Sequence, residues 1–446
     1  MALWHLFLSD LLDAVFPATD SVPLDRNHRE ELPALHPEAE MPKGRVQGVS
    51  IKFGEPCRLN NPVSWDILWR EVADIAINDQ PSRRIEPSRR IASVMDKQPR
   101  IHPQMEKVPV RELDAECSFF ASLREDYPGF RDWWDKISRQ GREAFVVRMD
   151  NELQAILILK IEEGPDESVP RLPSGKKLKI CTLYVQERGM KIGERLLRTA
   201  FEYAIVNGID DIYLTHFSKP NDSLVHLIEG YGFEKKEYTD EDLFLKKLRP
   251  PPTVSLSPLD LCRKYYPSFS GMPTVKKFII PIKPIYHKRL FEDCFMEKRT
   301  PLFPQFKGSF LSEGLAIKKA YLSHSQTRSI SPGDLVLFYR SEDSQALTTL
   351  GIVESLGERM AESTEIIQMV GERSVYSREE IEVFSRKPTL VILFQFLFHL
   401  QPSMKYRELI QSGILKGHPQ SIVQIQEDSF RKIVGNGRID ERFIVY

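Results

Sequence analysis

The chain has 446 residues, of which 41% are hydrophobic and 28% charged, and its formal net charge is −1. This length predicts about two to four domains with sizeable apolar cores, and the near-zero net charge excludes a protein that is basic or acidic as a whole. The five cysteines are scattered and form no CxxC pair, which argues against a metal cluster or a disulfide framework and favours a reducing, cytoplasmic compartment.

The first 105 residues form an N-terminal extension to which the sequence assigns no fold. Residues 1–16 combine apolar residues at helical spacing with two aspartates, which favours an amphipathic packing helix over a signal peptide. A second helix is predicted at 63–77. The motif Pro-Ser-Arg-Arg-Ile occurs at 81–85 and again at 87–91. We interpret these arginines as a solvated basic loop, with contact to nucleic-acid phosphate as the alternative.

A regular succession of strands and helices occupies residues 106–250. Its order, β-α-α-β-β-β-α-β-α-β-β, predicts one compact α/β domain with a mixed sheet. The pair Asp150-Asn151 is a hairpin signal between two of the strands. The strands are predicted at 107–113, 143–149, 153–162, 178–185, 211–216, 233–238 and 243–248, and the helices at 114–139 in two segments, at 193–205, and after a cap at Asn221 or Asp222.

The turn at 186–193 carries the strongest functional signal in this domain. It contains Gly189 and Gly193 and connects a predicted strand to a predicted helix. Such a turn exposes several backbone N–H groups on one side, and the helix dipole adds partial positive charge there. The turn therefore predicts a site for a phosphorylated cofactor.

The element order and this turn resemble the GNAT family of acyl-CoA-dependent N-acetyltransferases over residues 106–248. The cofactor turn of that family usually reads Arg/Gln-x-x-Gly-x-Gly/Ala; Arg188 and Gly193 match it, and Lys191 replaces the first glycine. The backbone of Lys191 can still donate if it adopts the required conformation, and its ammonium adds attraction for phosphate. The resemblance implies acetyl-CoA as cofactor. The residues implied to bind it are Leu183, Tyr184, Val185, Arg188, Gly189, Met190, Lys191, Ile192, Gly193, Glu194, Arg195 and Asn221.

The resemblance leaves the catalytic groups open. Asn221 and Gly232-Phe233 match the end of the family's second core helix, but the tyrosine that often protonates the departing thiolate in the family falls at Ile228. Acetyl transfer to an amine requires a deprotonated amine and a proton for the leaving sulfur. Tyr231 and His216 are therefore our candidates for the catalytic residues.

The second half of the chain is predicted to be a separate, β-rich domain at 276–446, reached through a proline-rich linker at 251–275. The run at 389–400 is the most apolar, but it is too short to span a bilayer and contains Gln395. We therefore expect a buried strand there, and no association with a membrane. Strands are predicted at 276–285, 316–323, 334–340, 347–356 and 389–400, and helices at 259–266, 286–296, 405–412 and 428–434.

This half resembles the PUA-like superfamily of small β-barrels, which includes the ASCH and EVE domains. The resemblance is carried by a Pro-Gly-Asp turn and apolar strand at 332–339, a returning strand at 351–354 and the segment 419–422. The ASCH signature Gly-x-Lys-x-x-Glu-x-Arg is absent and only approximated by Lys283 and 297–299, so ASCH catalysis is not implied. Barrels of this superfamily commonly bind RNA or a modified base.

Basic and aromatic residues alternate in the same half, which suits a groove for RNA. The alternative is that the aromatic side chains fill a barrel and the lysines cover it. The residues expected to contact nucleic acid are Lys283, Arg289, Arg328, Tyr339 and Arg340.

The sequence thus predicts an α/β (α+β) protein in which a GNAT domain precedes a PUA-like barrel. Its expected function is acetyl transfer from acetyl-CoA to an amine of unknown identity, with RNA or tRNA bound through 276–446. Two alternatives stay open. One is a non-catalytic acyl-CoA-binding scaffold, which Ile228 favours; the other is a toxin-type acetyltransferase that acts on aminoacyl-tRNA.

Overall fold

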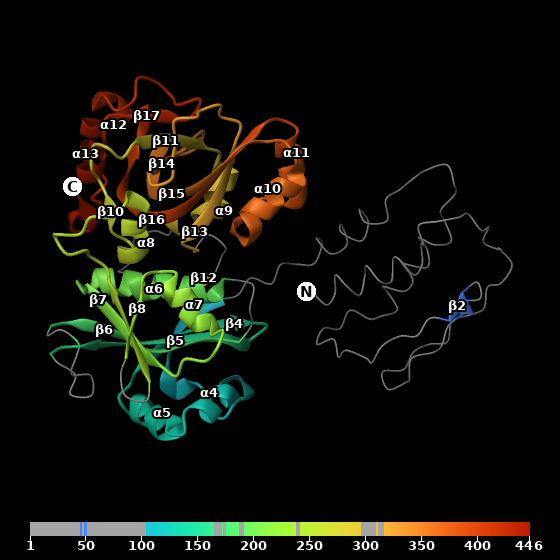
Figure 1. Cartoon of the computed structure of the whole chain (residues 1–446), viewed down its shortest axis with the longest axis vertical. Helices are drawn as coiled ribbons and strands as arrows, with labels where there is room; N and C mark the ends of the chain where they lie inside the picture. Colours follow the sequence, from blue (N-terminus) through green and yellow to red (C-terminus); the bar gives the residue numbers. More distant parts are fainter. Residues whose placement is uncertain are drawn as a thin grey trace. The chain divides into compact units, whose positions relative to one another are not determined.

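The computed structural model describes residues 104–164, 172, 175–186, 191–237, 241–295, 309–310 and 316–446, and the short paired strands β1 (Arg45–Val46) and β2 (Val49–Ser50). The chain separates into two compact units, Met1–Gln98 and Pro99–Tyr446 (Figure 1). The helices predicted at 1–16 and 63–77 and the repeated basic motif lie outside the described residues.

An eight-stranded mixed sheet forms the first half of the second unit. Its order is β12-β3-β4-β5-β6-β7-β9-β8, and only β6 and β7 are parallel. The predicted α/β fold class is confirmed. The strands are β3 (Gln104–Pro109), β4 (Glu143–Met149), β5 (Glu152–Glu162), β6 (Lys177–Val185), β7 (Asp211–His216), β8 (Glu234–Glu237), β9 (Asp242–Lys247) and β12 (Ser309–Phe310).

The hairpin between β4 and β5 shows how local sequence sets the register of this sheet. Asp150 and Asn151 both have positive φ, at 51° and 68°. A two-residue turn with both angles positive matches the twist of the strands and favours Asn or Asp. The predicted hairpin is confirmed.

Helices cover both faces of the sheet (Figure 1). On one face α4 (Ala121–Asp126) and α5 (Phe130–Arg139) enclose an aromatic core that includes Phe120, Phe130 and Trp134. On the other face lie α6 (Ile192–Val206) and α7 (Ser223–Glu229). Helix α6 buries most of its length, because its apolar side chains recur at helical spacing and fit against the sheet.

A second sheet of six strands, in the order β13-β16-β15-β14-β11-β17, forms the β-rich half. Strands β11 and β14 are parallel and the other neighbours antiparallel. Within the described residues the outer strands β13 and β17 do not pair, so the predicted closure into a barrel is not found. Its strands are β11 (Lys277–Ile282), β13 (Lys318–Ser323), β14 (Leu335–Arg340), β15 (Ala346–Met360), β16 (Thr389–Lys405) and β17 (Val423–Ile425). The short strands β10 (Phe269–Ser270) and β18 (Ile444–Val445) pair with each other in a separate parallel sheet.

Helices and short 3-10 turns surround this second sheet. The apolar run predicted as a buried strand is the first part of β16, which pairs with β13 and β15. No helix in the described parts of the chain has the length and apolar character needed to cross a membrane. The helices are α8 (Pro258–Tyr265), α9 (Pro284–Leu290), α10 (Ser363–Val370), α11 (Arg378–Ser385), α12 (Tyr406–Gln411) and α13 (Glu427–Asn436), and the 3-10 turns are Glu292–Phe295, Gly371–Arg373 and Glu441–Phe443. Two further 3-10 turns, Val110–Glu112 and Ser118–Phe120, pack under the first sheet.

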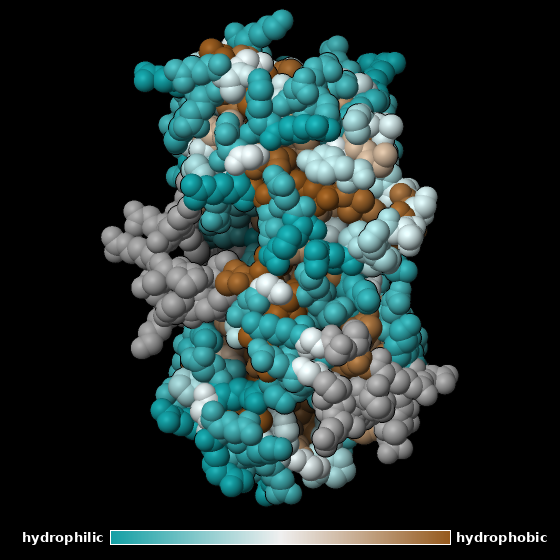
Figure 2. All heavy atoms as spheres, turned by 90° about the vertical axis from the view of Figure 1, so that its left-hand side faces the viewer, coloured by the Kyte–Doolittle hydropathy of each residue, from teal (hydrophilic) through white to brown (hydrophobic). Residues whose placement is uncertain are grey.

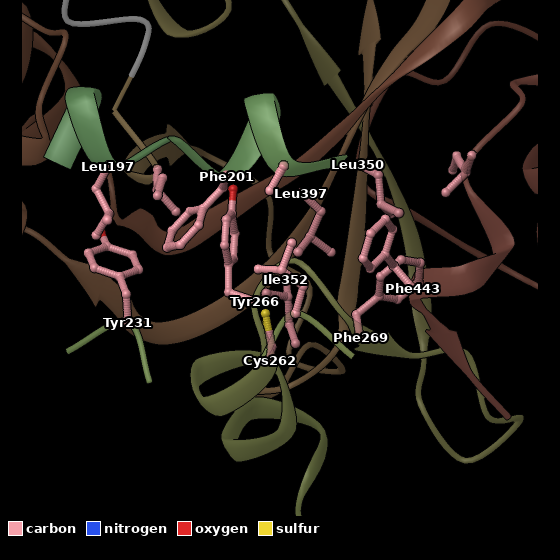
Figure 3. Packing of buried hydrophobic residues seen from close by; sticks show 14 of the residues in the cluster. Leu197, Phe201, Tyr231, Cys262, Tyr266, Phe269, Leu350, Ile352, Leu397 and Phe443 are labelled. Atoms are coloured by element: carbon pink, nitrogen blue, oxygen red, sulfur yellow. The ribbon is translucent and has the colours of Figure 1, made fainter. Parts of the chain in front are cut away.

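The two sheets share one apolar core (Figure 3). Helix α6 contributes one side of it, and α8, β15 and β16 contribute the other. The segment predicted as a linker, 251–275, therefore contains an ordered helix that packs in this core, whereas the predicted domain boundaries stay predictions. Residues of the shared cluster drawn in Figure 3 are Leu197, Phe201, Tyr231, Cys262, Tyr266, Phe269, Leu350, Ile352, Leu397 and Phe443.

Polar contacts cross the same boundary. The Glu194 carboxylate accepts a hydrogen bond from the backbone N–H of Lys318 at 2.7 Å. The buried Arg198 guanidinium forms an ion pair with Asp293 at 2.5 Å and lies 4.0 Å from the centre of the Phe396 ring. The face drawn in Figure 2 is mainly hydrophilic, with apolar groups exposed between hydrophilic residues.

Candidate active site

The candidate site is a cleft that opens where β6 and β7 separate. These strands pair only from Lys177↔Asp211 to Lys179↔Tyr213, although β6 continues to Val185 and β7 to His216. Beyond residue 179, β6 keeps its partner β5 but has no partner on its other edge among the described residues. Unpaired N–H and C=O groups of a strand edge can bind an extended amide-containing ligand. The cleft has a volume of about 1290 Å³.

The N-terminus of α6 lies at the open end of this cleft, where Lys191, Ile192 and Gly193 line it. No side chain caps the helix, so its first N–H groups stay available to a ligand. A Cβ on Gly193 would lie 3.0 Å from the Leu227 side chain, so the close approach of α7 favours glycine there. Of the predicted cofactor residues, Arg188, Gly189 and Met190 lie outside the described residues.

Lys191 occupies the position where the family pattern has a glycine. Its φ of 51° and ψ of 25° place it in the left-handed region, which favours glycine and strains other residues. Burial lowers the pKa of its ammonium. The Nζ atom is buried and makes no hydrogen bond within the described part of the chain. A buried cation of this kind, beside a helix N-terminus, fits a phosphate group.

Three polar side chains form a hydrogen-bonded row on the opposite side of the opening. The Tyr127 hydroxyl is 3.1 Å from His216 Nδ1, and His216 Nε2 is 2.7 Å from the Asp222 carboxylate. All three residues line the cleft. Asp222 also caps α7, since its Oδ1 accepts from the N–H groups of Leu224 and Val225. The uncertainty between two predicted caps is thereby resolved in favour of Asp222.

Within this hydrogen-bonded row, the electrostatics favour a protonated Tyr127 phenol and an ionised Asp222 carboxylate. Burial and the Glu241 carboxylate raise the pKa of Tyr127 to about 12. Burial alone would raise the pKa of Asp222, but the hydrogen bond and charge of His216 and two backbone N–H groups lower it. The ionised Asp222 carboxylate accepts a hydrogen bond from Nε2–H, which in a neutral ring leaves Nδ1 as the acceptor for the Tyr127 hydroxyl.

Most of the other predicted cofactor residues also reach the cleft. Leu183, Tyr184 and Val185 line it from β6, and Asn221 lines it as an exposed residue with φ of 58°. Glu194 lines the cleft while its carboxylate binds the second half of the unit. Arg195 is 6% exposed and is not part of the lining.

Tyr231, the other predicted catalytic residue, lies apart from the cleft. Its side chain is 4% exposed and packs against Phe201 and Tyr266 in the shared core. Burial and the Glu194 carboxylate raise the pKa of Tyr231 well above its usual value. Sequence reasoning missed Tyr127, and the only local signal was its place in the break between two helices.

The five residues expected to contact nucleic acid do not gather in one place. Lys283 and Arg289 line a hollow of about 620 Å³, and Arg328 is exposed but outside it. Tyr339 is 1% exposed, with its hydroxyl 3.1 Å from His418 Nδ1, and Arg340 is buried in an ion pair with Asp343. Both point into the packed sheet. No group of three or more His, Cys, Asp or Glu side chains in the described parts of the chain could hold a metal ion.

A mixed sheet that opens between two parallel strands, with an uncapped helix N-terminus at the opening, defines a cofactor-binding α/β domain. Residues 108–233 match the model of the acetyltransferase (GNAT) family. The match shows that this segment is similar to acetyltransferase domains, and it supports acetyl-CoA as its cofactor. No curated protein matches the chain significantly.

Solved structures similar to this chain include proteins of two kinds. The ASCH protein of Zymomonas mobilis is 10% identical with a TM-score of 0.28, and the match covers 36% of this chain and 94% of that one. The PaiA N-acetyltransferase of Thermoplasma acidophilum, solved with coenzyme A, is 18% identical with a TM-score of 0.26 and coverages of 32% and 98%. A GCN5-related N-acetyltransferase from Ralstonia eutropha is 20% identical with a TM-score of 0.24 and coverages of 31% and 97%.

Proposed function

We propose that this protein transfers the acetyl group of acetyl-CoA to an amine. The observation that carries the proposal is the unpaired edge of β6 beside the uncapped start of α6, within the segment that matches the acetyltransferase family. A strand edge and a helix N-terminus in one cleft suit a ligand that has both amide groups and phosphates.

The residues for cofactor binding follow from this geometry. The first turn of α6 and the ammonium of Lys191 hold the phosphates, and residues 183–185 of β6 pair with the amide groups of the pantetheine arm. Acetyl-CoA supplies a thioester-activated acetyl group at the opening between the strands. Glu194 is one of the residues predicted to bind the cofactor, but in this proposal its carboxylate holds α6 against the second half of the unit through the Lys318 backbone.

Tyr127, His216 and Asp222 provide a route for the proton of the acceptor amine. The Tyr127 oxygen receives this proton while its own proton passes to His216 Nδ1, 3.1 Å away. Asp222 orients the ring through Nε2 and stabilises the imidazolium that results. As the amine nitrogen bonds to the acetyl carbon and the carbon–sulfur bond breaks, the same proton would return through Tyr127 to the departing sulfur, which leaves as a thiol. In this proposal His216 acts as the general base through Tyr127, and Tyr231, which lies in the shared core, takes no part in the reaction.

The test uses the full chain. Isothermal titration calorimetry with acetyl-CoA measures binding, and thiol release with a panel of primary amines measures turnover. Binding and amine-dependent thiol release are expected. Absence of acetyl-CoA binding would refute the proposal, and binding without turnover with any amine would favour the scaffold alternative.

A second proposal concerns RNA binding by the β-rich half. Its support is the hollow lined by Lys283, Lys288, Arg289 and one carboxylate, Glu342. Arg289 also forms an ion pair with Glu380 at 2.6 Å, so the two lysines carry the excess positive charge. Fluorescence anisotropy with a labelled single-stranded RNA should show salt-dependent binding. Lys288→Glu should weaken it and Lys416→Glu, at an exposed lysine away from the hollow, should not. Equal effects of the two substitutions would contradict an RNA site here.

A further inference from the structure

We propose that the acceptor of the acetyl group is an acidic peptide, whose carboxylates bind a basic wall of the cleft. This inference rests on the proposed acetyltransferase function. The wall is formed by the cleft-lining residues of α5, of the turn after it, of β5 and of the first part of β6. Its members are Trp133, Lys136, Ile137, Gln140, Arg142, Lys160, Glu162, Lys179, Ile180 and Cys181.

Three cations of this wall, Arg142, Lys160 and Lys179, come from different elements and lie around Cys181. Arg142 Nη1 lies 3.8 Å from Cys181 Sγ, and Lys160 pairs with Lys179 in the register of β5 and β6. Lys136 projects from α5 as an exposed residue. Burial of Cys181 raises its thiol pKa, and the charges of Arg142 and Lys179 oppose that shift. Four positive side chains thus face one part of the cleft.

Negative charge in the same wall is small. Its one described carboxylate, Glu162, already binds Lys160 Nζ at 2.5 Å and accepts from the Tyr213 hydroxyl. Arg142 Nη2 donates to the neutral amide of Gln140 at 2.9 Å, and Lys179 lies over the Tyr213 ring at 5.4 Å. Within the described residues, Lys136, Arg142 and Lys179 have no carboxylate partner in this wall.

The acidic residues of the cleft lie elsewhere. Asp126 pairs with Lys219, Asp222 with His216, and Glu194 with the Lys318 backbone. The fourth, Glu241, acts electrostatically on Tyr127. These residues belong to the part of the cleft that contains the proton route and the start of α6. The separation of charges leaves the cofactor at the helix N-terminus and directs an anionic acceptor to the basic wall.

The wall suits a peptide better than a phosphate. Gln140 and Arg142 follow the C-terminus of α5, where the partial negative charge of the helix disfavours a concentrated dianion. The half-buried Trp133 adds an apolar surface to the wall, against which a side chain of a peptide can pack. An N-terminal α-amine is the suitable nucleophile because its ordinary pKa is about 7.7–8.0, below that of lysine.

The experiment compares two N-terminally free octapeptides, one with four glutamates and one with four lysines, otherwise identical. Their binding to the full chain saturated with CoA is measured by calorimetry, and their acetylation by thiol release. We expect the acidic peptide to bind about tenfold more tightly, from several partly exposed ion pairs. Lys136→Glu should remove most of that preference without changing acetyl-CoA affinity.

The matched control is Arg139→Glu on the same helix. Arg139 is exposed and outside the cleft, so its reversal should leave the preference unchanged. Equal binding of the two peptides, or binding of neither, overturns the inference even where acetyl-CoA binds normally. Tighter binding of a single-stranded RNA oligomer than of the acidic peptide at the wall would also overturn it, as would a loss of acetyl-CoA affinity in Lys136→Glu. Failure of acetyl-CoA to bind the unaltered chain would instead refute the proposed function.

Discussion

Replacing Gly232 by alanine should destabilise the protein by about 2–4 kcal/mol. Gly232 has φ of +80°, and a Cβ there would lie 2.3 Å from the Lys264 carbonyl oxygen and 2.8 Å from that of Arg263. The positive φ costs about 1 kcal/mol for an L-residue, and displacement of the backbone at the end of α8 adds about 1–3 kcal/mol. The same carbonyl of Lys264 accepts from the buried Lys246 ammonium at 2.5 Å, so its displacement also disturbs that contact.

The assay is urea unfolding of the full chain, followed by circular dichroism and tryptophan fluorescence. Gly141→Ala is the matched control, because Gly141 has φ of +67° but no atom within 4 Å of the added Cβ. It should lose only the backbone contribution of about 1 kcal/mol. If Gly232→Ala lost no more stability than Gly141→Ala, the close approach of α8 would not be the reason for glycine, and the packing argument would fail.

Three further predictions concern the cleft and His287, a fully buried residue of α9. His216→Ala should lower kcat about 100-fold or more while calorimetry shows unchanged acetyl-CoA affinity; an unchanged kcat would remove His216 from the proton route. Lys191→Gly should be more stable than Lys191→Ala by about 1 kcal/mol in urea unfolding, because only alanine is strained at φ of 51°; equal stabilities would contradict the left-handed backbone. Burial and the Arg340 charge lower the pKa of His287 to about 3, so between pH 6.5 and pH 3 the unfolded chain binds more protons than the folded one. The free energy of unfolding should therefore fall over this range more steeply than in His287→Gln. Parallel pH profiles of the two proteins would argue against a neutral buried ring.

Local features of the fold could be predicted because they depend on neighbouring residues. The hairpin at Asp150-Asn151 follows from two residues that tolerate positive φ. The strand–turn–helix signal correctly located the end of β6 and the start of α6, with Lys191 in a backbone region that favours glycine. Candidate cofactor residues close to this turn could be predicted from the sequence for the same reason.

Long-range features could not be predicted in this way. Tyr127 and His216 are 89 positions apart in the chain, and nothing in either local sequence indicates that they meet. In β14 all six residues are buried, because Leu335, Leu337 and Tyr339 face one core and Val336 and Phe338 the other. A strand covered on both faces has no solvent-facing side, so Tyr339 and Arg340 looked available to RNA in the sequence and are packed in the structure.

Helix α6 couples the stability of the first sheet and its helices to that of the β-rich half. It begins at the cofactor cleft, and its opposite side is packed by Tyr266, Ile352 and Leu397 from beyond residue 250. A fragment that ended near residue 250 would expose this apolar side and leave the buried charge of Arg198 without its partner Asp293. The two halves should therefore unfold in a single cooperative transition, and neither is interchangeable with a related domain from another protein unless the facing surface is exchanged with it.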